Sequence, residues 1–478
     1  MKLRCLRSIT VNEPAVEGRS VRAAIECRDL SGRRAEFVLR TRYDRSPGER
    51  PEDLLPLFRL AAAMPLLNYG LFADEIRLRF PLARADASLL SDLLAIFSRD
   101  IFINKFVRRK NPYLRPGVAP TPEEVTRGNA RPRALIIADN LVPDAPLAAG
   151  FDENSCGVLS SGGKESLLTA AMLEEIGGTV YPLYVNESGG HWTTARTAYR
   201  HHARTNRRTR RVWTNVDRLY TFMLDHLRII RADHRRIWND TYPIRLCIFP
   251  VYIFLLLPLF CREKIGNLLI GSEFDDPRAP KRHQGIQHYY GVYDQHQDFD
   301  RRMQRWYERR LPDLTQWSAV RPVTGLIVQR ILAQRYPEVA RLQRSCHSCH
   351  REGARVVPCG TCSKCLGVML FLLANRVDPT RLGYRPADVR ALPARLKSGG
   401  LRLDADERDH AAWLAYGPGN PLGGSAQPHV ESIHLHPATA DLKLVPPRFR
   451  ADLVRILRRY TRGGATLRNG IWHPAKVP

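Results

Sequence analysis

The sequence of 478 residues has no apolar run of the roughly 20 residues that a membrane-spanning helix needs. An almost wholly apolar stretch of about 15 residues without charge, 246–260, contains two prolines and predicts a buried helix. The first residues, Met1 to Ser8, hold no apolar signal core. These absences predict a cytoplasmic protein with no membrane partner.

Lysine is also scarce. Ten of the 74 basic residues are lysine, so arginine dominates a net charge of +26. Such an excess is typical of proteins that bind nucleic acid or other anions, although codon bias can produce it too. Arginine is densest in residues 196–236, with Trp213 and Tyr220 interleaved. We interpret this stretch as either a surface that binds tRNA or a solvated helical face, and both alternatives stay open.

The stretch Ser160-Ser161-Gly162-Gly163-Lys164-Glu165-Ser166 lies between an apolar run and a helical pattern that ends at Gly177-Gly178. This order predicts strand, turn and helix. Two glycines let backbone N–H groups approach an anion, and the helix N-terminus adds unpaired donors. The hydroxyls of Ser161 and Ser166 and the charge of Lys164 would add to phosphate binding. The simpler alternative is a turn that only joins a strand to a helix.

A second apolar run, 179–187, follows that helix and completes a β-α-β unit, which predicts a parallel sheet. Ligands of such sheets bind beyond the carboxyl ends of the strands, so Asn186 is expected near the turn. The buried strand expected at 267–271 opens into an acidic segment with Glu273 and Asp275. These carboxylates would hold Mg²⁺ against a pyrophosphate, or they form an ordinary acidic turn.

Five of the ten cysteines lie within residues 346–365. Two close groups, Cys346 with Cys349 and then Cys359, Cys362 and Cys365, suit a tetrahedral zinc ion that takes four of the five thiolates. In a large chain without a signal segment, this clustering favours a metal over disulfides. The alternative is a set of reduced thiols without metal.

The turn resembles the Ser-Gly-Gly-x-Asp-Ser loop of the N-type ATP pyrophosphatase (PP-loop) superfamily. With the cysteine module downstream, the sequence is similar to 7-cyano-7-deazaguanine synthases and to the ATP-dependent UDP-N-acetylmuramoyl-L-alanyl-L-glutamate epimerase family. Their zinc pattern is matched by Ser345-Cys346 and by Cys359, Cys362 and Cys365, which leaves Cys349 spare or in place of Cys346. Pro243 and Arg245 match a Pro-x-Arg-Asn motif.

The resemblance implies a parallel-sheet core similar to the adenine nucleotide alpha hydrolases. It implies an enzyme that uses ATP, Mg²⁺ and Zn²⁺ and adenylates a small-molecule carboxylate. The residues expected in catalysis are Ser161, Lys164, Glu165, Ser166 and Arg245. Those expected to bind the nucleotide are Ser160, Ser161, Gly162, Gly163, Lys164, Ser166 and Asn186. Two departures are Leu246, where the motif has Asn, and Glu165, where the loop usually has Asp. Glu165 keeps open a module that binds nucleotide without turnover.

The length allows two or three domains. Alternating segments before residue 45 and helical patterns near 52–64 and 87–99 predict an N-terminal α+β domain with a linker, residues 1–130. We assign residues 131–340 to the ATP-binding domain, 341–378 to the zinc module and 379–478 to a C-terminal extension. The fold class expected is therefore α/β. The oligomeric state and the identity of the substrate stay open.

Overall fold

The computed structural model describes residues 2–48, 50–237, 239, 242–279, 281–346, 348–353 and 355–477. Within these ranges, no helix combines the length and the apolar character needed to cross a membrane. The uncharged stretch at 246–260 forms most of helix α6 (Phe249–Glu263), whose side chains are almost all buried. The prediction of a buried helix is confirmed.

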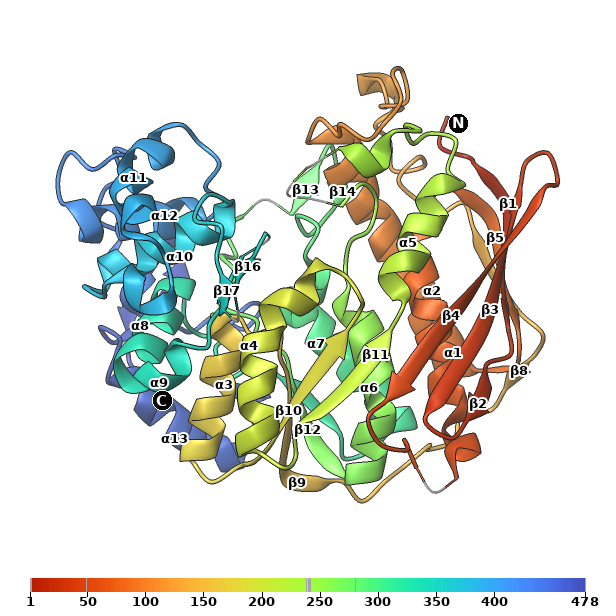
Figure 1. Cartoon of the computed structure of the whole chain (residues 1–478), viewed down its shortest axis with the longest axis horizontal. Helices are drawn as coiled ribbons and strands as arrows, with labels where there is room; N and C mark the ends of the chain where they lie inside the picture. The colour runs from red at the N-terminus through yellow and green to blue at the C-terminus, as the bar shows by residue number, and fades with distance from the viewer. Residues whose placement is uncertain are drawn as a thin grey trace.

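One large sheet runs through most of the molecule (Figure 1). Its strands, in spatial order, are β15 (Thr315–Trp317), β12 (Ile265–Leu269), β9 (Asp152–Leu159), β10 (Thr179–Asn186), β11 (Arg210–Thr214), β4 (Arg34–Tyr43), β3 (Ser20–Asp29), β1 (Leu6–Asn12), β5 (Ala73–Arg79) and β7 (Leu135–Ala138). The short strand β2 (Ala15–Glu17) pairs with β3. The α/β class is confirmed, and the sheet is mostly parallel.

The parallel group from β15 to β11 is built from β-α-β units. Helices α3 (Lys164–Glu175) and α4 (Gly190–Thr205) connect β9 to β10 and β10 to β11. Strand β11 then pairs antiparallel with β4, with Val212 opposite Tyr43. The strands of the N-terminal region therefore continue the same sheet. The alternating segments before residue 45 form the antiparallel pairs of β3 with β1 and β4, whereas β1 and β7 each pair parallel with β5.

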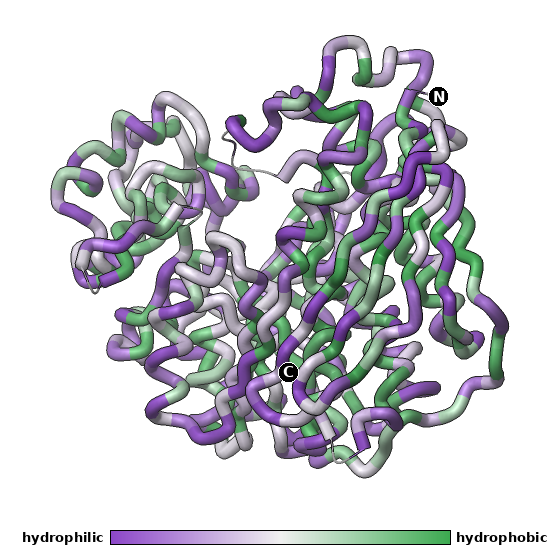
Figure 2. Tube along the Cα trace, turned by 45° about the vertical axis from the view of Figure 1, so that its right-hand side comes forward, coloured by the Kyte–Doolittle hydropathy of each residue, from purple (hydrophilic) through white to green (hydrophobic). Residues whose placement is uncertain are grey.

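Helices cover both faces of the sheet. One buried cluster joins α1 (Leu55–Ala63), α2 (Arg84–Ile101), α5 (Val216–Asp225), α6 and α7 (Gln297–Arg310). The other joins α3, α4, α8 (Gly325–Arg335), α9 (Pro337–Ala340) and α13 (Pro447–Arg458). In Figure 2, hydrophobic segments gather along the sheet and the helices against it. Loops, rather than helices, lie at the carboxyl ends of the parallel strands.

A third buried cluster forms a separate lobe with the cysteines, at the upper left of Figure 1. It contains α10 (Ser363–Ala374), α11 (Pro386–Lys397) and α12 (Ala405–Tyr416). The remaining strands form small ladders: β6 (Leu82–Ala83) with β8 (Leu141–Val142), β13 (Arg282–His283) with β14 (Ile286–Gln287), β16 (His350–Glu352) with β17 (Arg355–Val357), and β18 (Ile433–His434) with β19 (Gly464–Arg468) and β20 (Ile471–Ala475). The lobe and the sheet are joined by α8, which contacts both α3 and α10.

Candidate anion site and cysteine cluster

The turn after β9 is a tight loop that only glycine permits at its centre. Gly162 has φ +75°, and a Cβ there would lie 3.1 Å from the carbonyl oxygen of Thr194 on α4. The hydroxyl of Ser160 accepts a hydrogen bond from the Gly162 N–H and lies 3.2 Å from the Ser166 hydroxyl. Ser166 in turn donates to the Gly163 carbonyl at 3.2 Å. Ser160 and Ser166 therefore brace the loop, whereas Ser161 is exposed.

Backbone donors of this loop are free to bind a ligand. Among the described residues, the N–H groups of Ser161, Gly163 and Lys164 donate to no protein acceptor. Helix α3 begins at Lys164 and runs for 12 residues, so its positive dipole end lies at the same point. This combination of unpaired N–H groups and a helix N-terminus suits an anion such as a phosphate.

Lys164 is buried and lies between two carboxylates. Its Nζ is hydrogen-bonded to Glu165 and, at 2.8 Å, to Oε2 of Glu273. Burial opposes the charge of Lys164, but the two carboxylates outweigh it and raise the lysine pKa. Burial and the charge of Glu165 raise the pKa of Glu273, although Lys164 opposes them. Burial would also raise the pKa of Glu165, but Lys164 outweighs it and lowers that pKa. Lys164 is therefore charged and compensated within the protein.

Glu165 lies at the edge of the candidate anion position. A Cβ built on Gly163 would be 3.0 Å from Oε2 of Glu165 and 3.6 Å from the hydroxyl of Ser161. The segment after β12 packs closely against Glu165, because a Cβ on Gly271 would lie 2.6 Å from the Glu165 Cβ. The longer arm of Glu165 thus places a negative charge beside the free N–H groups.

The acidic segment after β12 gives no support to the magnesium prediction. Asp275 Oδ2 lies 2.9 Å from Nζ of Lys281 and 2.8 Å from Nδ1 of His296. Glu273 is bonded to Lys164 and lies against the start of α8, where a Cβ on Gly325 would be 2.8 Å from Oε2. Within the described ranges, the carboxylates do not converge on a metal position. We therefore derive no step through Mg²⁺.

Arg245 is buried beside the carboxyl end of β10. Its guanidinium lies 3.6 Å from the ring centre of Tyr242, and Nη1 is 3.7 Å from both Glu187 Oε2 and Asp217 Oδ1. Burial opposes the charge of Arg245, but the surrounding groups, Tyr242 first and Glu187 next, raise its pKa. Within the described part of the chain, Arg245 Nη1, Glu187 Oε1 and Tyr220 Oη are buried without hydrogen-bond partners. Such a group of unsatisfied polar atoms is typical of a site that takes water or a ligand.

Asn186 accepts a hydrogen bond from the Ser188 N–H at 3.0 Å, so its side chain shapes the turn after β10. His191, at the start of α4, lies 2.6 Å from the Tyr242 hydroxyl. Burial and the charges of Arg245 and then Lys364 lower the pKa of His191 to about 4, so the imidazole is neutral at pH 7. Sequence reasoning missed His191, because a histidine inside a helical pattern carries no local signal of a site.

Four cysteines converge as the sequence predicted. The sulfur atoms of Cys346, Cys359, Cys362 and Cys365 all lie within 4.8 Å of one another. Backbone N–H groups of Ser348 and Cys359 approach the sulfur of Cys346 at 3.2 and 3.3 Å. A set of four thiolates with N–H donors suits a closed tetrahedral Zn²⁺ site, which would link the segment before α10 to the helix itself. Cys349 is outside the group.

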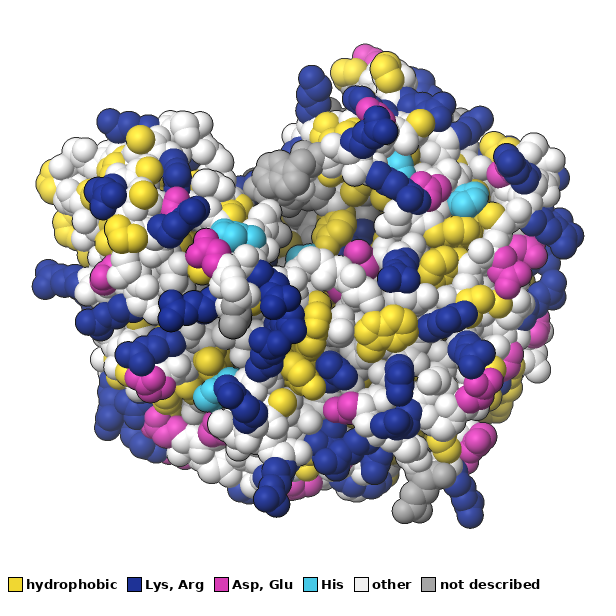
Figure 3. Space-filling model, viewed as in Figure 1, with side chains coloured by type: hydrophobic (Ala, Val, Ile, Leu, Met, Phe, Trp, Pro, Cys, Tyr) yellow, Lys and Arg dark blue, Asp and Glu magenta, His cyan; other side chains and the backbone are white. Residues whose placement is uncertain are grey.

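The cysteine module contacts the loop between β9 and α3 directly. Arg344, two residues before Cys346, donates its backbone N–H to the Gly162 carbonyl at 3.0 Å. The hydroxyl of Ser345 would lie 3.9 Å from a Cβ on Gly163. Lys364, at the start of α10, contributes to the lowered pKa of Glu165. Figure 3 shows the surface hollowed between the lobe with α10–α12 and the rest of the molecule.

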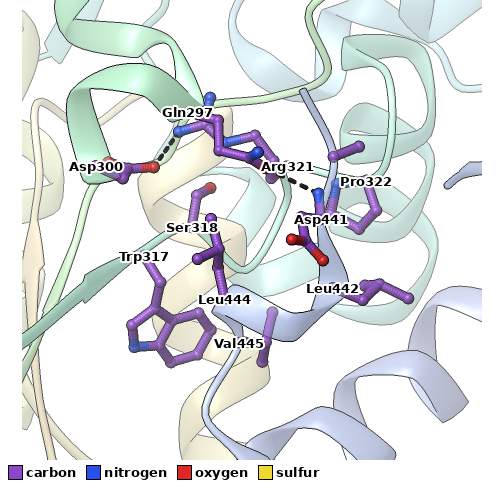
Figure 4. A pocket seen from close by; sticks show the side chains of 11 residues that line it. Gln297, Asp300, Trp317, Ser318, Arg321, Pro322, Asp441, Leu442, Leu444 and Val445 are labelled. Carbon is purple, nitrogen blue, oxygen red and sulfur yellow. Dashed lines mark hydrogen bonds and ion pairs between the residues drawn. The ribbon is translucent and has the colours of Figure 1, made fainter. Parts of the chain in front are cut away.

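Arg321 lies away from the loop after β9 and from the cysteine cluster. It is buried in an ion pair with Asp300 at 2.5 Å and lines a small cavity between α7 and the C-terminal segment around Asp441 (Figure 4). Gln316 also donates to Asp300, at 2.9 Å. We interpret this cluster as an anchor for the C-terminal region.

Comparison with known proteins adds no relative. No family model, no curated protein and no solved structure matches the chain.

Proposed function

We propose that the protein is an ATP-dependent PP-loop enzyme that adenylates a small-molecule carboxylate and releases pyrophosphate. The observation that carries this proposal is the loop between β9 and α3, where the backbone N–H groups of Ser161, Gly163 and Lys164 are free at the N-terminus of the helix. The unpaired polar atoms around Arg245, in the crevice beyond β10, offer a place for the rest of the ligands.

In this proposal, a carboxylate oxygen of the substrate attacks the α-phosphorus of ATP. The bond from that phosphorus to the bridging oxygen breaks, and pyrophosphate leaves with the electron pair. The N–H groups of Gly163 and Lys164 and the exposed hydroxyl of Ser161 would stabilise the departing charge. Arg245 would attract the substrate acid or the nucleotide. Zn²⁺ supplies only cross-linking when bound, because four thiolates leave no open position.

The test is an assay for AMP and pyrophosphate. Gly163 has φ −81°, so Gly163→Ala is compatible with the backbone, but its methyl group would intrude where the anion binds. We expect Gly163→Ala and Ser161→Ala to remove pyrophosphate release. The matched control is Ser31→Ala, in the exposed turn between β3 and β4, and it should retain activity. A folded Ser161→Ala protein that releases pyrophosphate like the wild type contradicts the proposal.

For the metal, elemental analysis of reduced protein should find about one zinc per chain. Cys365→Ser should lose the metal, and the control Cys349→Ser should keep it. A folded, reduced wild-type sample without zinc rejects this site.

One surface favours a second candidate, a tRNA-modifying PP-loop enzyme. Arg196 and Arg200 on α4 lie near Arg351 on β16, and the charges of Arg200 and Arg351 lower the pKa of Arg196. Figure 3 shows Lys and Arg side chains gathered where β17 meets α4. Retention of tRNA with a steep salt dependence, lost in Arg196→Glu, supports this candidate.

A third candidate is a nucleotide-binding zinc protein without turnover, because Glu165 already neutralises Lys164. Nucleotide binding without release of AMP or pyrophosphate, whatever acid is added, would favour it over both enzymes.

A further inference from the structure

The far edge of the large sheet carries an unusual concentration of exposed apolar side chains. Among the described residues, eight large hydrophobic side chains are exposed, and four of them lie on β7 and β8. These are Leu135 (69% exposed), Ile137 (40%), Leu141 (60%) and Val142 (36%). β7 ends the strand order, and Figure 1 shows the neighbouring β8 at the right-hand rim. An exposed apolar edge strand is a template for pairing with another strand.

The direction of the free backbone groups on β7 follows from its ladder with β5. The N–H of Asp139 donates to Leu78 on β5 at 3.2 Å. Since successive residues of a strand alternate, the groups of Leu135 and Ile137 also face β5. The N–H and C=O groups of Ile136 and Ala138 therefore face outward, where the described chain offers no further strand.

The side chains of β7 are complementary to a second, antiparallel copy of the same strand. Arg133, Leu135, Ile137 and Asp139 share one face, because side chains repeat every second residue. In a two-fold pairing centred on Ile136, each Leu135 faces Ile137 of the other copy and each Arg133 faces Asp139. Arg133 and Asp139 are exposed, and among the described residues their ion pairs are weak ones with Asp74 and Arg79 of β5, at 3.5 and 3.9 Å.

We propose that the chain forms a two-fold homodimer in which β7 of one copy pairs antiparallel with β7 of another, so that the sheet continues across both. In this register, the outward N–H and C=O of Ile136 exchange hydrogen bonds with those of the second copy. A two-fold interface uses the same surface on both chains, as this strand allows. The strand is short, so we expect an association in the micromolar range rather than an obligate dimer.

Sedimentation equilibrium of the full chain tests this, over roughly 1–100 µM. The mass should rise from 54.5 kDa toward twice that value. Ile137→Lys should raise the Kd at least tenfold, by burying a charge in the pair. The matched control is Ile471→Lys, an exposed isoleucine on β20 (62% exposed), which should dimerise like the wild type.

A charge exchange checks the register. Arg133→Glu and Asp139→Arg should each weaken the dimer, because like charges then face each other, and the double variant should restore it. Intramolecular effects of the two changes persist in the double variant, so restoration isolates the contact between copies. A wild-type chain that stays monomeric, larger open-ended species, a dimer that survives Ile137→Lys, or a double variant without recovery each overturns the proposal.

Discussion

Glu165 gives the sharpest test of where an anion binds. Its carboxylate lies beside Gly163 and is bonded to Lys164, so it opposes any anion held by the free N–H groups. Glu165→Gln keeps the shape and an oxygen for Lys164 but removes the charge. We expect this variant to bind inorganic pyrophosphate more tightly, in buffer without added divalent cations.

The magnitude follows from the geometry. Two unit charges about 4 Å apart interact by about 4 kcal/mol at an effective dielectric constant of 20. The Glu165 side chain is 27% exposed, so we reduce this for screening by water to about 2 kcal/mol. Since about 1.4 kcal/mol corresponds to a factor of ten, the Kd should fall about 30-fold.

Isothermal titration calorimetry measures this Kd directly. The control is Glu174→Gln, which lies nine residues later on the same helix, about 14 Å away at the helical rise. The control should leave the Kd unchanged. An unchanged or higher Kd in Glu165→Gln refutes the placement of the anion at this loop.

Three further predictions concern stability and coupling. Cys365→Ser should weaken ATP binding and lower the Tm. Loss of the metal would release the hydrogen bond from Arg344 to Gly162, which is worth about 1 kcal/mol. The control Cys349→Ser should change neither quantity. Burial raises the pKa of Asp294 to about 7. The stability that the protonated Asp294 side chain contributes is therefore present below about pH 4 and is lost as the pH rises through 7. The Tm of Asp294→Asn should not show that loss. Asp86→Ala should destabilise the fold by about 3–5 kcal/mol in urea titrations, because it leaves buried Arg310 without its carboxylate; a loss below 1 kcal/mol contradicts this.

The features that the sequence predicted well are encoded over short distances. The Gly162-Gly163 turn, the helix after it and the stop at Gly177 depend on residues within about 20 positions. The cysteine spacing brings Cys346 to Cys365 together for the same reason. The buried helix α6 could be predicted from the composition of its uncharged stretch alone.

The features that the sequence did not predict depend on contacts between distant segments. Nothing near Val212 indicates that β11 pairs with Tyr43 on β4, because strand pairing leaves no local signal. The same holds for Lys364, which acts on Glu165 only after α10 docks. The carboxylate of Glu273 was expected to hold Mg²⁺, but it is bonded to Lys164, a residue 109 positions earlier.

The hydrogen bond from Arg344 to Gly162 has a consequence for synthesis of the chain. Gly162 is synthesised 182 residues before Arg344, whose backbone N–H binds the Gly162 carbonyl. The last cysteine of the cluster, Cys365, follows Arg344 by 21 residues. At about 5–20 residues per second, this interval lasts roughly 10–40 s. A nascent chain therefore cannot complete this candidate anion site early. If the loop binds nucleotide and the cysteines bind metal as proposed, the last step of building that site coincides with the arrival of the four thiolates, and the supply of metal would decide when the loop can bind its ligand.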